Sequence, residues 1–310
     1  MSDGISRRDL GKLAAGAAAV AATGLPGTSE AHDIFPGAHG PVLTYAPNRD
    51  YVWDCYAQGG YNLMKYVTGW GMPNLGSEIG WCVSFPRVVI VRTVTGDGTN
   101  SLGTNKLYPD PNAVQNEITP WYNARNSIWI EIGNEPNGAW LNQYGQSGST
   151  DENLIWNWRY WLDQCIARCR SVFPNAKLIS PGLTPAAAAN PGRWMAIAAD
   201  VMRKCDYIGW HVYGYNDWYN SGDLQRMVPL MNQYFSGKQW VLSEFGLNGN
   251  LDKYTKGQRN AGLIHKSQSN PVIPANNIAS AYYHLATNLT PDPSYCIYPE
   301  GDRGYKSITG

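Results

Sequence analysis

The sequence lacks an excess of charge of either sign. Its 310 residues include 24 Lys and Arg against 24 Asp and Glu, so the formal net charge at pH 7 is zero, and only 15% of residues are charged. Nucleic acids are bound through clustered basic side chains that neutralise phosphates. The sequence has no such basic stripe, so we expect no nucleic-acid partner. With 43% apolar residues, the chain can instead bury a large core.

The motifs that bind common cofactors and metals are also missing. The sequence contains no G-x-G-x-x-G, no C-x-x-C-H or iron–sulfur spacing, and no H-E-x-x-H or C-x-x-C. These absences disfavour a redox enzyme and a zinc site, and we expect neither a metal nor an organic cofactor. Six cysteines are present, but their spacing does not define which of them pair, so the disulfide connectivity stays open.

Long hydrophobic runs are absent as well. The only candidate is a weakly apolar stretch over residues 13–25, which is shorter than the ~20 residues a membrane span needs. It follows the pair Arg7-Arg8, and the segment resembles a twin-arginine (Tat) export signal. The tripeptide Ser29-Glu30-Ala31 offers a cleavage site. We therefore predict a signal peptide over residues 1–31 and a mature domain over 32–310, secreted or periplasmic, monomeric and free of the membrane; a lone anchor helix is the alternative.

After this segment, short β-rich runs alternate with helical patterns, which is typical of βα units around a parallel sheet. Eight strands and seven helices are expected, which predicts a single-domain (β/α)₈ TIM barrel with an irregular last helix. The expected strands are 37–44, 62–67, 87–94, 127–133, 177–180, 207–212, 239–243 and 278–285. The expected helices are 50–58, 75–83, 111–124, 152–173, 193–203, 224–235 and 254–267.

Two glutamates follow predicted strands at the end of the barrel where such folds carry their chemistry. Glu135 follows the fourth strand in Gly133-Asn-Glu-Pro136, and Glu244 follows the seventh in Ser243-Glu-Phe-Gly246. A glycosidic bond needs such a pair, because one carboxylic acid protonates the leaving oxygen while the other carboxylate attacks the anomeric carbon or activates water. At a separation of about 5 to 5.5 Å the second carboxylate is a nucleophile and configuration is retained.

Asn134-Glu135-Pro136 after the fourth strand, with a glutamate after the seventh, resembles clan A of the glycoside hydrolases, which are retaining enzymes on the (β/α)₈ barrel. The resemblance implies that Glu135 is the general acid/base and Glu244 the nucleophile. It further implies that Asn134 contacts the sugar hydroxyl beside the reacting carbon. In His211-Val-Tyr213 it implies that the tyrosine orients the nucleophile while the histidine lines the reacting subsite.

Two positions depart from the clan's pattern. Clan members carry an arginine near the end of the second strand, whereas Arg92 ends the third strand expected here, so either the strand at 62–67 is absent or the chain differs from the clan. In both cases Arg92 could pair with Glu244 or Glu131. Many clan members also place a tryptophan on the eighth strand, where this chain has Tyr282-Tyr283-His284, and Tyr283 could replace it as the floor of the subsite.

The other candidate residues are a carboxylate and a group of aromatic side chains. Glu131 lies four residues before Glu135 on the same strand face, and we predict that it is a buried, paired structural carboxylate. The chain has 13 Trp and 20 Tyr, whose flat apolar faces suit stacking on sugar rings. Those on strands and helices fit the core better, whereas those after the fourth and sixth strands are candidates for sugar stacking: Trp140, Tyr144, Tyr215, Trp218 and Tyr219.

These observations predict an exported retaining glycoside hydrolase that cleaves β-glycosidic bonds of a neutral polysaccharide or oligosaccharide by double displacement. The alternative is a non-catalytic barrel that binds carbohydrate without turnover. Which glycan and linkage are recognised, and whether the action is endo or exo, depends on loop shape and stays open.

Overall fold

The computed structural model describes residues 35–39, 63–68, 79–80, 82–84, 86–93, 110–138, 152–218, 221–264 and 273–283, with positions 303 and 307. Contacts within the chain divide it into two units, Met1–Ala31 and His32–Gly310, and every described residue belongs to the second. The predicted signal peptide and cleavage site lie outside the described residues and stay predictions. In the described part, no helix combines the length and apolarity that crossing a membrane requires.

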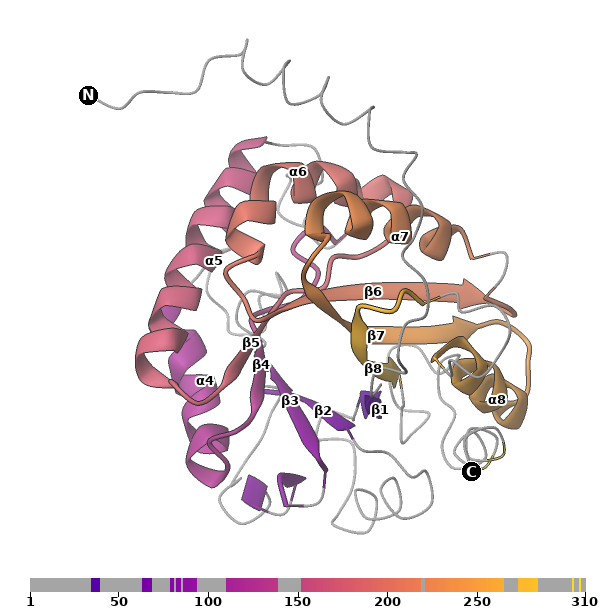
Figure 1. Ribbon diagram of the computed structural model, residues 1–310, viewed down its shortest axis with the longest axis horizontal. Coiled ribbons are helices and arrows are strands. Elements are labelled where there is room, and N and C mark those ends of the chain that lie inside the picture. The colour runs from indigo at the N-terminus through magenta and orange to yellow at the C-terminus, as the bar shows by residue number, and fades with distance from the viewer. Residues whose placement is uncertain are drawn as a thin grey trace. The chain divides into compact units, whose positions relative to one another are not determined.

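Eight parallel strands close into one barrel in sequence order, as the sequence predicts (Figure 1). Each pairs with the next, and β8 pairs back with β1. The strands are β1 (Phe35–His39), β2 (Leu63–Val67), β3 (Val88–Arg92), β4 (Trp129–Glu131), β5 (Lys177–Ser180), β6 (Tyr207–Tyr215), β7 (Gln239–Asn248) and β8 (Asn277–Tyr283).

Helices follow the strands and pack outside them. Figure 1 shows α4, α5, α6 and α7 in succession around the outer side of the strands, and consecutive members of this series contact one another. The described helices are α4 (Pro111–Ala124), α5 (Glu152–Val172), the 3₁₀ turn η2 (Ala187–Ala189), α6 (Pro191–Met202), α7 (Gly222–Phe235) and α8 (Lys253–Ile264). The helix predicted at 50–58 lies outside the described residues, and that predicted at 75–83 is described only in part.

Local sequence explains where two of these helices begin. Asp110 accepts a hydrogen bond from the backbone N–H of Asn112, and Pro111 occupies the first turn of α4, where its missing N–H costs nothing. Ser221 caps α7 by accepting a hydrogen bond from the N–H of Leu224. Both helices also contain an internal proline.

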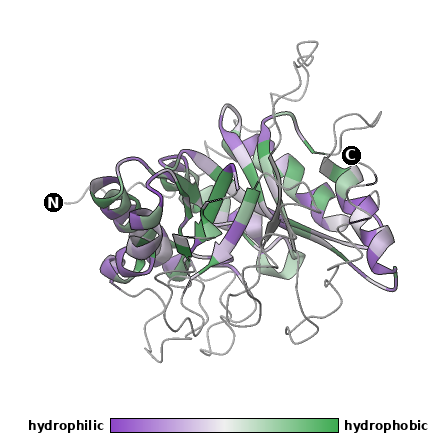
Figure 2. Ribbon diagram, turned by 90° about the horizontal axis from the view of Figure 1, so that it is seen from below, coloured by the Kyte–Doolittle hydropathy of each residue, from purple (hydrophilic) through white to green (hydrophobic). Residues whose placement is uncertain are grey.

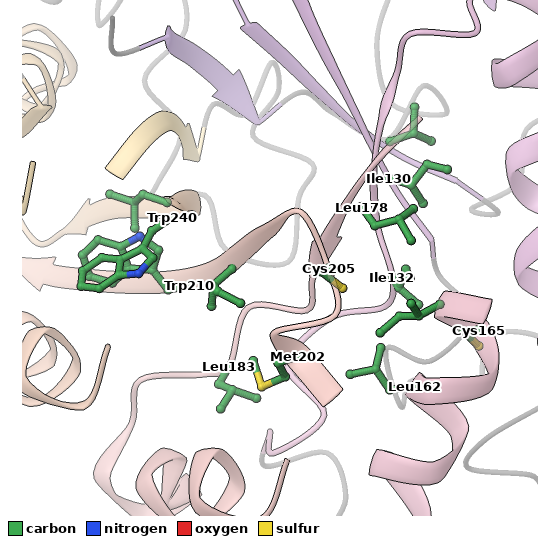
Figure 3. Close-up of a cluster of buried hydrophobic side chains, with 14 of the residues drawn as sticks. Ile130, Ile132, Leu162, Cys165, Leu178, Leu183, Met202, Cys205, Trp210 and Trp240 are labelled. Carbon is green, nitrogen blue, oxygen red and sulfur yellow. The ribbon is translucent and has the colours of Figure 1, made fainter. Parts of the chain in front are cut away.

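The main hydrophobic core lies between the barrel and its helices. In Figure 2 the hydrophobic colour concentrates on the strands, whereas the helices also carry hydrophilic residues. Figure 3 shows Ile130 of β4 and Leu178 of β5 near Ile132, with Leu162 of α5 on the helix side. The indole rings of Trp210 and Trp240 meet edge to face with centroids 6.0 Å apart, so these tryptophans are core residues, as the sequence indicates.

Four cysteines have free thiols, and all four are buried: Cys82, Cys165, Cys169 and Cys205. Burial raises the pKa of the Cys169 thiol to about 12 and raises that of Cys205 as well, so both are uncharged at neutral pH. Cys55 and Cys296 lie outside the described residues. The described cysteines are therefore core residues.

The interior of the barrel changes from apolar to charged along the strands. The part nearer the N-terminal ends of the strands is a small cluster of apolar side chains that includes Leu63, Ile90 and Ile179. Two residues further along their strands, Lys65 follows Leu63 and Arg92 follows Ile90. Side chains two apart on a strand share one face, so the charged residues stack above the apolar ones inside the barrel.

β6 and β7 run further than the sequence predicts. They were expected to end at residues 212 and 243, but they extend to Tyr215 and Asn248 and stay paired to the end, with Tyr213 opposite Gly246 and Tyr215 opposite Asn248. Glu244 therefore lies within β7 and not after it, which corrects the predicted position. The extension is stabilised by mutual pairing, a tertiary feature that a single-strand pattern does not contain.

Candidate active site

The two predicted catalytic carboxylates meet at the C-terminal part of the strands. Carboxylate oxygens of Glu135 and Glu244 and one ring nitrogen of His211 all lie within 4.8 Å of one another. The side chain of Glu135 is 19% exposed, whereas that of Glu244 is 4% exposed. The pair therefore combines one carboxyl group that solvent reaches with one that is almost enclosed.

A strained turn presents Glu135. It follows Gly133, which has a φ of 80°, and itself has a φ of 39°, a left-handed conformation that costs a non-glycine residue about 1 to 3 kcal/mol. The Glu135 N–H donates to Gly182 O at 2.9 Å, and the Gly133 N–H donates to Thr93 Oγ1 at 2.8 Å. Hydrogen bonds to the residues that follow β3 and β5 thus hold the turn in a conformation it would not adopt alone.

Asn137 fastens the same turn to the segment after β5. Its side-chain amide donates to Thr184 O at 3.0 Å and to Ala189 O at 3.2 Å, and its carbonyl accepts from the Thr184 N–H at 2.9 Å. The side chain is fully buried. Asn137 was not predicted, although an amide directly after the Asn-Glu-Pro tripeptide is a signal that sequence reasoning could have used.

A β-bulge places Glu244. Trp210 of β6 pairs with Leu242, but the next residue, His211, pairs with Glu244, so Ser243 is an extra residue in β7. Consecutive strand residues normally point to opposite faces, and a bulge re-aims them. Ser243 and Glu244 consequently both reach the polar groups inside the barrel.

Three groups hold the Glu244 carboxylate. Arg92 Nη1 lies 2.7 Å from Oε1, Lys65 Nζ lies 3.3 Å from the same oxygen, and the Tyr213 hydroxyl donates to Oε2 at 2.8 Å. Two cations and a phenol favour the ionised form of a carboxylate. The predicted contact of Tyr213 with Glu244 is present, and Arg92 pairs with Glu244, one of its two predicted partners.

The position of Arg92 is also decided. The strand expected at 62–67 exists as β2, and Arg92 ends β3 beside it, with Val67 of β2 opposite. The chain therefore departs from the clan pattern, in which the arginine lies near the end of the second strand. Its guanidinium still reaches Glu244 from this strand.

Glu131 is buried and paired, as predicted. Its side chain is fully enclosed, and Oε2 lies 2.6 Å from Lys65 Nζ. Burial on its own would raise the pKa of Glu131, but Lys65 and then His211 lower it to about 2. Lys65 was not predicted, although a lysine inside the apolar run Leu63–Val67 is the signal that would have revealed it.

His211 lies between Glu135 on one side of its ring and Ser243, which contacts Glu131, on the other. Nδ1 lies 2.8 Å from Glu135 Oε1, and Nε2 lies 3.1 Å from Ser243 Oγ. Burial on its own would lower the pKa of His211, but the carboxylates of Glu244, Glu131 and Glu135 raise it to about 9. The ring is fully buried, so it supports the site from behind and does not form part of an open subsite wall.

Gly182 leaves the space for this imidazole. A Cβ at position 182 would lie 2.3 Å from His211 Cδ2 and Nε2, a distance that real side chains do not tolerate. The Gly182 N–H also donates to Glu131 Oε1 at 3.4 Å. The residue was not among the predicted site positions, because nothing local in Ser180-Pro-Gly-Leu183 indicates the packing of a ring from β6.

The remaining predicted substrate-binding residues differ in outcome. Asn134 precedes Glu135, and its buried Oδ1 has no hydrogen-bond partner among the residues the structure describes. Trp218 was expected to stack on sugars, but it is only 5% exposed and packs against Phe245, so it belongs to the core. Trp140 and the side chain of Tyr283 lie outside the described residues.

No protein-family model and no curated protein matches the chain in sequence. In three dimensions the chain is similar to a glycoside hydrolase family 5 enzyme from Prevotella bryantii, with a TM-score of 0.58, 12% identity, and coverage of 90% of this chain and 96% of that one. The chain therefore shares the barrel fold of that enzyme.

Two further similar structures support the same assignment of fold. An endo-1,4-β-mannanase from Rhizomucor miehei has a TM-score of 0.58 and 13% identity, over 92% of this chain and 97% of that one. A β-glucuronidase from Bacteroides uniformis has a TM-score of 0.55 and 11% identity over 82% of this chain. The chain spans 30% of the length of that β-glucuronidase.

The same three side chains are spaced as metal ligands would be. Glu135, His211 and Glu244 offer ligand atoms close enough to share one ion. However, Arg92 and Lys65 already lie at 2.7 and 3.3 Å from Glu244, and their positive charges oppose a bound cation. The positions of these two cations therefore disfavour a metal ion between the carboxylates.

Proposed function

We propose that the chain is a retaining glycoside hydrolase that cleaves β-glycosidic bonds by double displacement. In this mechanism Glu135 protonates the leaving oxygen while Glu244 attacks the anomeric carbon and forms a glycosyl ester. Glu135 then takes a proton from water, which displaces the sugar from Glu244. The observation that carries the proposal is the placement of Glu135 and Glu244 with carboxylate oxygens within 4.8 Å of each other in a barrel similar to those of glycoside hydrolases.

The carboxylate separation favours retention. Inverting enzymes keep their two carboxyl groups about 6.5 to 9.5 Å apart to admit a water molecule, whereas retaining enzymes keep them about 5 to 5.5 Å apart. Oxygen atoms of Glu135 and Glu244 that come within 4.8 Å of each other fit the shorter, retaining spacing better than the inverting one. The different environments also suit two roles, because Glu244 is held by two cations, whereas Glu135 pairs with the His211 ring nitrogen among the described residues and is 19% exposed.

We assign a neutral glycan as the substrate class. Both cations of the described site, Lys65 and Arg92, are already paired with carboxylates, so neither is free to bind a sugar acid. The Oδ1 of Asn134, which has no hydrogen-bond partner within the described part of the chain, suits a hydroxyl donor on the sugar. The similar structures include enzymes named for mannan and β-glucan. We propose that the substrate of this protein is a β-linked polysaccharide or oligosaccharide of the same kind.

The experiment measures hydrolysis of β-glucans, mannans and xylans by the wild type, Glu135→Gln and Glu244→Gln, with Glu152→Gln as the matched control. Glu152 begins α5, its side chain is 56% exposed, and its partner is Arg193 rather than a residue of the site. We expect both site variants to lose at least about a hundredfold in kcat/KM and the control to keep its activity. Nuclear magnetic resonance of the first product should show the β anomer. Wild-type turnover in either site variant would overturn the proposal, and glycan binding without released reducing sugar would favour a binding protein.

A further inference from the structure

The buried residues beneath the catalytic pair form a chain of contacts with a defined direction. Lys65 Nζ lies 2.6 Å from Glu131 Oε2, Ser243 Oγ lies 2.6 Å from Glu131 Oε1, and His211 Nε2 lies 3.1 Å from Ser243 Oγ. His211 Nδ1 then lies 2.8 Å from Glu135 Oε1. The first four of these side chains are fully buried, so bulk water does not compete for their hydrogen bonds.

The ionised Glu131 determines which group donates each hydrogen bond in this series. Beside Lys65, Glu131 is a carboxylate without a proton, and such a group can only accept hydrogen bonds. Ser243 therefore donates its single hydroxyl proton to Glu131. Having used that proton, its oxygen can only accept, so His211 Nε2 must carry the hydrogen that donates to it.

With Nε2 protonated, Nδ1 and Glu135 Oε1 have one proton between them. Either the ring carries it and Glu135 is ionised, or Glu135 carries it and the ring is neutral. We infer that Glu131 and Ser243 are positioning residues that fix His211 in the Nε2–H form, so that Glu135 and His211 together store the proton delivered to the leaving oxygen. This inference rests on the proposed glycoside hydrolase function.

The charges around the site balance in this arrangement. Before reaction, the two cations offset two carboxylates, and the pair with its shared proton is neutral. When Glu244 bonds to the anomeric carbon it loses its negative charge, and the Glu135–His211 pair becomes negative because its proton leaves with the alcohol. The buried cluster therefore stays neutral, and the proton from the attacking water restores the pair. Among the described residues, three carboxylates face His211: Glu135 and Glu131, from the loop after β4 and from β4, and Glu244 from β7. Two cations, Lys65 from β2 and Arg92 from β3, face these carboxylates.

Glu131→Gln should reverse the donor and acceptor roles along this series of hydrogen bonds. The carbonyl oxygen of the new amide would face Lys65, and its NH₂ group would donate to Ser243, which would then donate its own proton to His211 Nε2. The neutral ring would carry its hydrogen on Nδ1 and donate it to an ionised Glu135. The proton donor would be lost although Glu135, His211 and Glu244 are all present.

Two measurements test this. The first is ¹⁵N spectroscopy of the full chain with labelled histidine, in which His211→Ala identifies the His211 signals among the five histidines. In the wild type we expect a hydrogen on Nε2, whether or not the ring also carries one on Nδ1; in Glu131→Gln we expect a hydrogen on Nδ1 and none on Nε2. Ser243→Ala should give a mixture, because Glu131 Oε1 remains 3.8 Å from Nε2. The tautomer does not depend on turnover, so this result stands even if the chain hydrolyses no glycan.

The second measurement compares substrates that differ in their need for an acid. For Glu131→Gln we expect kcat/KM on an ordinary glycan to fall by about a hundredfold, with the alkaline limb of its pH profile moved to lower pH. An aryl glycoside whose phenol leaves without protonation should lose less than about threefold, a difference that a general loss of structure would not produce. Ser243→Ala should show the same difference between the two substrates, but smaller. This variant tests the inference if Glu131→Gln does not fold. An Nε2–H pattern in folded Glu131→Gln, or an equal loss on both substrates, would overturn the inference.

Discussion

Arg92 Nη1 lies 2.7 Å from Glu244 Oε1, although the two residues belong to β3 and β7 on different sides of the barrel. The contact crosses the interior of the barrel and meets a carboxylate that Tyr213 holds from its other oxygen. A nucleophile must stay ionised until it attacks, and a buried carboxylate stays ionised only when cations and donors surround it. The charged layer inside this barrel provides those partners.

Removal of Arg92 should move the pH range of activity. In Arg92→Met, Glu244 keeps Lys65 but loses the nearer cation, so its ionisation becomes harder. We expect kcat/KM to fall by at least about tenfold at neutral pH and the acid limb of its pH profile to move to higher pH. Arg168→Met is the control, because Arg168 is a surface residue of α5 that contacts Gln115. An unmoved acid limb would show that Arg92 does not control the ionisation of the nucleophile.

Gly182→Ala should displace the His211 ring. The added methyl would lie 2.3 Å from the imidazole, and relief of such overpacking costs about 1 to 3 kcal/mol of stability. The shifted ring would also lose its hydrogen bond with Glu135, so activity should fall more than stability alone explains. Gly80→Ala is the control, since a Cβ there would meet nothing within 4 Å. Thermal unfolding and kcat measure the two effects, and full activity in Gly182→Ala would contradict the packing described here.

Tyr215 is a candidate platform for a neighbouring sugar ring. It is 64% exposed and lies two residues beyond Tyr213, on the same side of β6, in the extension that the sequence did not predict. In Tyr215→Ala we expect KM to rise by about threefold to tenfold while the melting temperature stays within about 1 °C, because stacking on an aromatic face contributes about 0.5 to 1.5 kcal/mol. Tyr160→Ala is a matched control, since that tyrosine is 66% exposed on the outer helix α5. Equal effects of both variants would exclude a role for this strand extension in binding.

The stability of the protein should depend on pH through two buried groups. The pKa of His211 rises from 6.5 to about 9 on folding, so its contribution is complete below pH 6.5 and is lost as pH rises through 9. The pKa of Glu131 falls from 4.5 to about 2, so its contribution is present above pH 4.5 and is lost as pH falls toward 2. Denaturant unfolding should therefore give a maximum between these limits. In His211→Gln the alkaline decline should be smaller, and an unchanged decline would assign it to other groups.

Sequence reasoning located the candidate catalytic pair because its evidence is local. Asn134-Glu135-Pro136 and Glu244 follow apolar runs, and the alternation of such runs with helical patterns predicts the barrel that the structure has. The burial of Glu131 was predicted from its spacing on the strand, whereas the contact of Tyr213 with Glu244 was implied by the resemblance to clan A. Trp218 was assigned to the wrong environment, because a position after a strand does not reveal that Phe245 of the neighbouring strand covers it.

The sequence by itself determined the order of the elements and which side chains share a strand face, because both depend on patterns within one segment. It did not contain the bulge that makes Ser243 an extra residue, the left-handed backbone at Glu135, or the space beside Gly182 that His211 fills. These features depend on pairing and packing between strands that are distant in the chain. For the same reason only the tertiary structure decided that Lys65, Glu131, Ser243 and His211 form one buried network beneath the catalytic pair.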